Sequence, residues 1–89
     1  MEATAVPRRR DGLESSSLGG RLILYDPASG ALHTLNRSAA EIFELCDGSR
    51  SVGQVLATLC GRYGVPEEEI GGDVIACLQE LREKELVVL

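Results

Sequence analysis

The hydrophobic pattern of this 89-residue chain changes period once, near residue 35, and this change constrains the fold more than any other feature. Before it, three short segments rich in branched, aromatic or small polar residues are typical of β-strands, at residues 13–18, 21–25 and 31–35. Residues 26–30 (Asp-Pro-Ala-Ser-Gly) separate the last two as a turn, because proline presets φ and glycine accepts a positive φ. This pattern predicts a hairpin or a three-stranded antiparallel meander.

After residue 35 the apolar residues recur at the 3.6-residue spacing of helices, in three successive stretches. Asn36 is a suitable N-cap for the first helix, which Asp47-Gly48 ends. Ser51, followed three residues later by Gln54, predicts a capping box at the start of the second helix. Gly64 closes that helix with a residue that tolerates the left-handed conformation.

The third helix has a strong body and a weak beginning. Residues 67–69 are three glutamates that suit the positive end of a helix dipole. Gly71-Gly72 weakens the first turn, so we expect the helix to start nearer Asp73. After it, the apolar segment 86–89 should add a strand or dock on the core.

Strands, three helices and a terminal strand together predict an α+β fold of the winged helix-turn-helix type. We expect an N-terminal three-stranded antiparallel β-sheet, three α-helices and a short C-terminal strand. Residues 1–11 carry Pro7 and three arginines before any periodic pattern begins, and we expect a flexible tail there. The single domain is expected to span residues 12–89, because a chain of this length has no room for a second one.

Composition excludes several classes of function. No run of 18 apolar residues is present, which excludes a membrane-spanning helix. The N-terminus does not resemble a secretory signal, because its charges follow a short, weakly apolar stretch, so we expect a cytoplasmic protein. The net charge of −5 argues against a nucleic-acid or anionic-membrane partner.

The three cysteines predict neither a metal site nor a disulfide framework. Cys46, Cys60 and Cys77 are 14 and 17 positions apart, without the paired spacing of a structural zinc site. Each falls on the apolar side of an expected helix, where a free cysteine behaves as a small hydrophobic residue.

No constellation in the sequence points to an enzyme. His33 is the only imidazole, and no motif places a nucleophile and an orienting group beside it. We interpret it as a surface residue of an edge strand. The glycine pairs lack the spacing of a phosphate-binding loop. The sequence therefore predicts no catalytic residue, no cofactor and no metal.

The chain resembles the PqqD-like proteins, the recognition elements of pathways that modify ribosomally made peptides. The resemblance runs from about Val6 to Leu89, and its specificity lies in an ordered set of short motifs rather than in any one of them. These motifs are Leu24-Tyr25-Asp26-Pro27, Gly30, Leu35-Asn36, Ala39-Ala40-Glu41-Ile42, Leu45-Cys46-Asp47-Gly48 and Asp73-Val74, followed by Leu78 and Leu81.

Two positions depart from the family pattern. Glu85-Leu86 stands where Gly-Leu is usual, which affects the end of the third helix because glutamate adopts a left-handed cap less readily than glycine. Cys77 stands where an aromatic residue is common, so we expect the core beneath that helix to be slightly under-filled.

The resemblance implies a stand-alone chaperone, not an enzyme, that binds the leader segment of a precursor peptide by strand addition. It would present the peptide to a modifying enzyme, such as a radical-SAM protein, or to a leader peptidase. The leader would pair with the third strand and rest on the third helix, and Arg82 and Lys84 would attract an acidic leader. The implied peptide-binding residues are Ala31, Leu32, His33, Thr34, Leu35, Val74, Leu78, Leu81 and Arg82.

A winged-helix DNA-binding transcriptional regulator is the alternative. Its recognition helix should be basic where it meets phosphates. Residues 67–85 instead carry seven acidic residues and two basic ones, a net charge of −5 on the helix that would enter the groove. DNA binding is therefore disfavoured.

Overall fold

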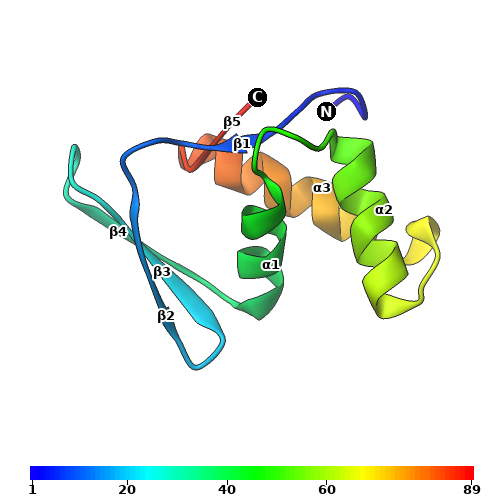
Figure 1. Cartoon of the computed structure of the whole chain (residues 1–89), viewed down its shortest axis with the longest axis horizontal. Helices are drawn as coiled ribbons and strands as arrows, with labels where there is room; N and C mark the ends of the chain where they lie inside the picture. The colour runs from blue at the N-terminus through cyan, green and yellow to red at the C-terminus, as the bar shows by residue number, and fades with distance from the viewer.

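A computed structural model describes all residues, 1–89, and its elements follow the expected order of strands, helices and a terminal strand (Figure 1). The two-residue β1 is additional. The elements are β1 Arg8–Arg9, β2 Glu14–Leu18, β3 Arg21–Asp26, β4 Ala31–Leu35, α1 Arg37–Leu45, α2 Val52–Tyr63, α3 Glu67–Glu83 and β5 Val87–Val88.

The main sheet is a three-stranded antiparallel meander in the order β2-β3-β4. Leu24, at the centre of β3, pairs with Ser15 on one side and with His33 on the other. Alternate residues of β3 are buried, because successive side chains of a strand point to opposite faces. Every residue of β2 is exposed, and its only close packing partner among the elements is β3. The inner face of β3 and β4 thus rests on the helices, whereas β2 is an outlying strand.

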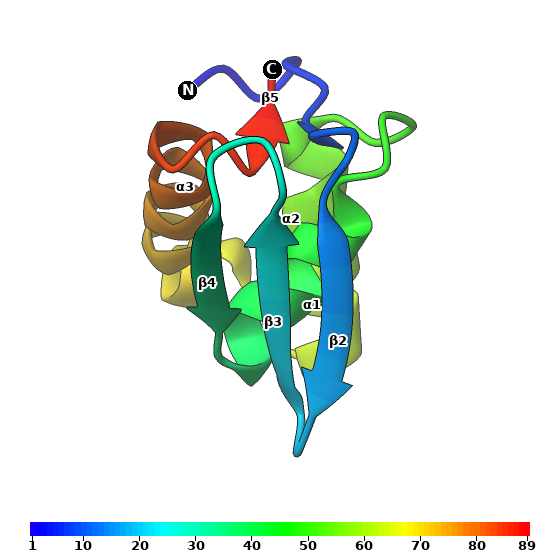
Figure 2. The same ribbon diagram turned by 90° about the vertical axis from the view of Figure 1, so that its left-hand side faces the viewer.

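Figure 2 shows how the helices lie against this sheet: α1 and α2 are behind it, and α3 lies on the side of β4, with its C-terminal half near Thr34 and Leu35. One cluster of 17 buried apolar residues joins the sheet to all three helices. Leu24 of β3 is 0% exposed, and Leu59 of α2 and Leu78 of α3 are each 1% exposed. The predicted winged-helix-like α+β fold is confirmed.

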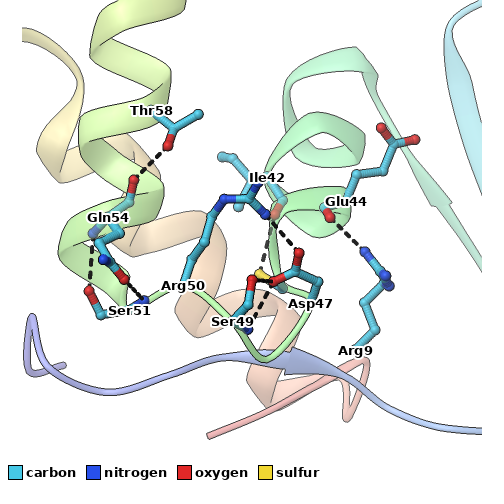
Figure 3. A network of polar contacts seen from close by, with 10 residues as sticks. Arg9, Ile42, Glu44, Asp47, Ser49, Arg50, Ser51, Gln54 and Thr58 are labelled. Carbon is cyan, nitrogen blue, oxygen red and sulfur yellow. Dashed lines mark hydrogen bonds and ion pairs between the residues drawn. The ribbon is translucent and has the colours of Figure 1, made fainter.

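The caps of the first two helices form as the sequence predicts. The Asn36 side chain accepts a hydrogen bond from the Ala39 N–H at 2.8 Å. At α2 the Gln54 N–H donates to the Ser51 hydroxyl at 3.2 Å, and the Ser51 N–H donates to the Gln54 side chain at 2.8 Å (Figure 3). Gly64 ends α2 at φ +64°, where glycine avoids the steric cost that a side chain would bring.

The start of α3 was predicted wrongly. The helix begins at Glu67, six residues before Asp73, and includes Gly71 and Gly72. Ile70 packs against the core, and a Cβ atom at Gly71 would lie 3.7 Å from the Leu56 side chain, so this first turn is held against α2. Tertiary packing outweighs the low helix propensity of two glycines, which amounts to about 1 kcal/mol each.

At the other end of α3, Glu85 occupies the left-handed cap position. Glu85 has φ +59° and is the only residue other than glycine with a positive φ. Its N–H donates to the Arg82 carbonyl at 3.0 Å, and the Leu86 N–H donates to the Leu81 carbonyl at 2.9 Å. This pair of bonds is a Schellman motif with a glutamate in the left-handed position.

Glu85→Gly should therefore stabilise the domain. A left-handed residue with a Cβ costs about 1–2 kcal/mol, and glycine loses about 0.5–1 kcal/mol more backbone entropy on folding, so we expect a net gain of about 0.5–1 kcal/mol. Urea unfolding measures the change. Glu85→Ala is the matched control, because alanine removes the carboxylate and keeps the Cβ. Equal stabilities of the glycine and alanine variants would contradict this account.

The N-terminal segment differs from the flexible tail expected over residues 1–11. β1 pairs with β5 through Arg8–Val88 and Arg9–Val87, and Pro7 is buried. The Arg9 N–H also donates to the Cys46 carbonyl at 2.8 Å, so β1 fills the space between β5 and the end of α1. Local sequence could not reveal this contact, because its partners lie about 40 and 80 residues away in the chain. The domain boundary at residue 12 stays a prediction.

Asp26 ties this segment to the β3–β4 turn. Its carboxylate accepts hydrogen bonds from the Ala28 N–H at 3.1 Å and the Ser29 hydroxyl at 2.9 Å, and it forms an ion pair with Arg10. Arg10 is the largest of the causes that lower the pKa of Asp26, and the Ser29 and Ala28 bonds act in the same direction against partial desolvation. Asp26 is 7% exposed, so these partners replace most of its water.

Because its folded-state pKa is lowered, Asp26 should stabilise the domain above the unfolded-state pKa of about 3.9 and lose this effect as the pH falls through the folded-state value. We therefore expect Asp26→Asn to be less stable than the parent at pH 7, with the difference shrinking below about pH 4. Urea unfolding across this pH range measures it. Asp11→Asn, at an exposed carboxylate without an ion pair, is the control. A difference that does not depend on pH would contradict the role of the charge.

None of the three helices is both long and apolar enough to cross a membrane.

Candidate functional site

β4 is an edge strand with β3 on one side and no strand on the other. Its outer edge therefore presents backbone N–H and C=O groups that another extended chain can pair with. β2 is the other edge of the sheet, but all of its residues are exposed and none of them lines either of the cavities described next. The C-terminal half of α3, by contrast, lies close to the end of β4, because Thr34 and Leu35 share a cavity with Cys77, Glu80, Leu81 and Lys84.

Two adjoining cavities fill the space between β4, α1 and α3. The smaller, of about 130 Å³, lies between Thr34-Leu35 and the Glu80–Lys84 end of α3. The larger, of about 410 Å³, continues between α1, α2 and α3 as far as Tyr63 and Ile70. The two cavities, called the groove below, share four lining residues: Asn36, Ala39, Cys77 and Glu80. The groove thus begins at the C-terminal end of the free strand edge and runs on between the helices.

One stripe of α3 faces the groove. Asp73, Cys77, Glu80 and Lys84 are spaced by four, three and four residues, which keeps them on a single face of a helix with about 3.6 residues per turn. The buried stripe of Val74, Leu78 and Leu81 lies next to it. The groove is therefore walled by a polar stripe and floored by the neighbouring core residues.

The predicted strand residues are only partly brought to the groove. Thr34 and Leu35 line it, whereas Leu32 is 67% exposed and pairs with Tyr25 on the strand next to it. Ala31 and His33 are half-buried and line neither cavity. All five residues 31–35 nevertheless belong to the free edge strand, where a peptide would pair with the backbone rather than with the side chains.

The predicted residues of α3 also differ in whether they line the groove. Val74 and Leu81 contribute to the lining although both are buried, and Leu78 lies wholly in the core. Arg82 lines neither cavity, because two residues after Glu80 it points to nearly the opposite side of the helix. Lys84 does line the smaller cavity, where its ammonium pairs with Glu80 at 3.0 Å.

Sequence reasoning missed the four residues that line both cavities. The helical spacing from Asp73 to Lys84 was a usable signal for Cys77 and Glu80, but nothing in the sequence marks which flank of the buried stripe stays open. The small side chain of Cys77 lies where the two cavities meet. The under-filling expected at this position is therefore in the groove and not beneath α3.

The titratable groups around the groove favour binding over nucleophilic chemistry. Burial is the largest of the causes that raise the pKa of the Cys77 thiol, which leaves little thiolate at neutral pH. Away from the groove, burial raises the pKa of Cys46 to about 12, and its thiol donates to the Ile42 carbonyl at 3.2 Å. The Tyr63 hydroxyl donates to both oxygens of Glu41 at 2.9 Å, and this bond raises the pKa of Tyr63.

Around the end of α1, a polar network fixes the loop that leads to α2 (Figure 3). Asp47 accepts hydrogen bonds from the Ser49 N–H at 2.9 Å and the Ser49 hydroxyl at 2.6 Å, and pairs with Arg50 at 2.8 Å. Arg9 donates to the Glu44 carbonyl at 2.6 Å. None of these residues lines the groove, so Asp47 has a structural role in this loop.

Comparison with protein families matches residues 21–87 to the family described as Coenzyme PQQ synthesis protein D (PqqD). The chain belongs to the PqqD family. The match covers β3 and β4 of the main sheet, all three helices and the start of β5, which includes every residue that lines the groove.

Curated relatives in the PqqD family match the chain over part of their length. A PqqA binding protein of Rhodopseudomonas palustris strain HaA2 is 52% identical over 46 residues, which is 52% of this chain and 45% of the relative. One from Bradyrhizobium diazoefficiens is 50% identical over the same shares. One from Gluconobacter oxydans is 42% identical over 50 residues, 56% of this chain and 52% of the relative. The chain thus spans about half the length of the curated relatives it matches.

Two solved structures share the fold over nearly the whole chain. The lasso peptide synthetase B1 complexed with its leader peptide has a TM-score of 0.78 at 25% identity, covering 96% of this chain and 100% of that one. TbiB1 in complex with the TbiA(beta) leader peptide has a TM-score of 0.77 at 20% identity, covering 90% and 93%. The arrangement of sheet and helices described above is therefore shared with both of these solved structures.

Proposed function

We propose that this protein binds the leader segment of a ribosomally made precursor peptide by strand addition to β4 and presents it to a modifying enzyme. The observation that carries the proposal is the free edge of β4 opening onto the groove beside α3. Strand addition draws its affinity from main-chain hydrogen bonds and its specificity from pockets for side chains. Both requirements meet at this edge.

The choice of β4 over β2 follows from what lies beside each strand. A peptide added to β4 places alternate side chains over the groove, where they contact apolar floor residues such as Leu81. A peptide added to β2 would pair with a strand that is exposed throughout and lines neither cavity of the groove. Backbone bonds alone, made in water, give little net free energy.

The proposed binding residues are the edge strand Ala31–Leu35 and the groove residues Asn36, Ala39, Cys77, Glu80, Leu81 and Lys84, with Val74 in the floor. Leu78 supports this site from the core, and Arg82 lies outside it.

We propose a binding role without catalysis, carried out in the cytoplasm where a precursor peptide is made. Relatives of this chain are named for binding PqqA, and both solved structures hold leader peptides. These names support a precursor peptide as the ligand here. The partner enzyme would be a radical-SAM protein or a leader peptidase, and it would act on the peptide while the leader is held on β4.

The test is a fluorescence anisotropy titration with a labelled precursor peptide encoded beside this protein's gene. Ordering a flexible leader costs free energy, so we expect a Kd of roughly 10 nM to 10 µM. A scrambled peptide of the same composition is the control. Equal binding of the two peptides, or no binding at about 100 µM protein, would overturn the proposal.

A salt-dependent affinity for duplex DNA in the same assay would instead support the winged-helix regulator. We expect none, because the segment 67–85 that would enter the DNA groove carries a net charge of −5.

A further inference from the structure

The larger cavity of the groove carries an uncompensated negative charge. Twelve residues line it, eight of them hydrophobic, and its only charged residues are Asp73 and Glu80. Glu80 is paired with Lys84 at 3.0 Å. Asp73 has neither an ion pair nor a side-chain hydrogen bond, so its carboxylate meets an incoming ligand without a competing cation.

An aromatic ring lines the same cavity as these carboxylates. Tyr63 lines the cavity and is 51% exposed. The hydrogen bonds of its hydroxyl to Glu41, both 2.9 Å, hold the ring in place from outside the cavity, where Arg62 also pairs with Glu41 at 3.4 Å. A fixed tyrosine ring attracts cations through its face.

The floor of the cavity is apolar, with Ile42 and Leu59 buried in the core and Ile70 packed against it. A lysine or arginine side chain has an aliphatic stem that covers such a surface and a charged head that stays at the rim. A leucine or phenylalanine would contact the apolar floor but leave the carboxylate of Asp73 without a cationic partner.

We propose that this cavity binds a basic side chain of the precursor peptide, with the stem on the apolar floor and the cation between Asp73 and Tyr63. The inference rests on the proposed function, because it takes the peptide on β4 as the source of the side chain. It reverses the acidic preference expected from Arg82 and Lys84, since Arg82 faces away from the groove and Lys84 is neutralised by Glu80.

The place of the basic residue in the peptide follows from the groove. The larger cavity joins the smaller one through Asn36 and Ala39, just beyond the last residue of β4, Leu35. The basic residue should therefore lie in the flank of the peptide that passes Leu35, next to the segment paired with the strand.

A double-mutant cycle tests the proposal. Each lysine or arginine of the precursor peptide is replaced in turn by methionine, which keeps an unbranched stem without the charge, and each peptide is titrated against the parent protein and Asp73→Asn. We expect one replacement to weaken binding by about 3- to 10-fold in the parent and to have almost no further effect in Asp73→Asn. Glu83→Gln, an exposed α3 carboxylate outside the groove, is the matched control and should leave the full effect of that replacement.

A charge reversal gives the second arm. Asp73→Lys should weaken binding of the parent peptide. It should restore binding of a peptide in which glutamate replaces the coupled basic residue. If the peptides bind but no basic residue couples to Asp73, the inference is wrong and the strand-addition proposal stands. If no peptide binds the parent protein, the proposed function fails, and the inference fails with it. Thermal unfolding of each variant shows that loss of binding is not loss of fold.

Discussion

Ala39→Arg should weaken binding of the precursor peptide by at least about 30-fold, the effect of losing one strong interface anchor. Ala39 is half-buried on α1 and lines both cavities, so a long side chain there grows into the space that the peptide would occupy. Its guanidinium has the opposite charge to the groove carboxylates and is thereby held in place. Anisotropy with the labelled peptide measures the loss.

Gln79→Arg is the matched control, because it adds the same charge at an exposed position of α3 that does not line the groove. Its Kd should stay within about twofold of the parent, as expected for a remote surface change. Unfolding free energies of both variants should stay within about 1 kcal/mol of the parent. If the two arginine variants bind the peptide equally well, the groove is not the binding site.

Leu78→Glu should unfold the domain. Leu78 is 1% exposed at the centre of the cluster that joins α3 to the rest of the core. Truncation of such a residue to alanine costs about 2–5 kcal/mol, and an unpaired buried carboxylate costs more. A domain of this size has only about 5–15 kcal/mol of stability in total. Circular dichroism should therefore show loss of helix at 25 °C.

Leu78→Met is the control for this prediction, because a swap of similar volume should cost less than about 1.5 kcal/mol and leave peptide binding intact. A Leu78→Glu variant that keeps its helices and loses only peptide binding would contradict the account. It would mean that Leu78 faces the groove, as the family resemblance alone implied, and not the core.

The sequence predicted those parts of the fold that depend on local chemistry. Asn36, Ser51 with Gln54, and Gly64 all cap helices as expected, because a cap involves neighbours within four residues. The start of α3 was wrong because packing of its first turn against Leu56 on α2 is a tertiary contact. For the same reason the pairing of β1 with β5, which joins the two ends of the chain, has no local signal.

The candidate site was predicted to the level of its elements but not of its side chains. The free edge at Ala31–Leu35 follows from strand order, and the structure has β4 at that edge. On α3, the sequence marks one apolar stripe, and the flank of that stripe that stays open depends on where α1 and β4 lie. Arg82 and Lys84 are both basic and near each other in sequence, yet only Lys84 reaches the groove.

The central claim is that a peptide adds to the edge of β4, and amide hydrogen exchange of the protein with and without saturating precursor peptide tests it most directly. In an antiparallel sheet, alternate N–H groups of an edge strand point away from the neighbouring strand. We predict that the peptide slows exchange at alternate residues of 31–35 and leaves residues 14–18 of β2 unchanged. Slower exchange at β2, or only at α1 and α2 with β4 unchanged, would contradict the account.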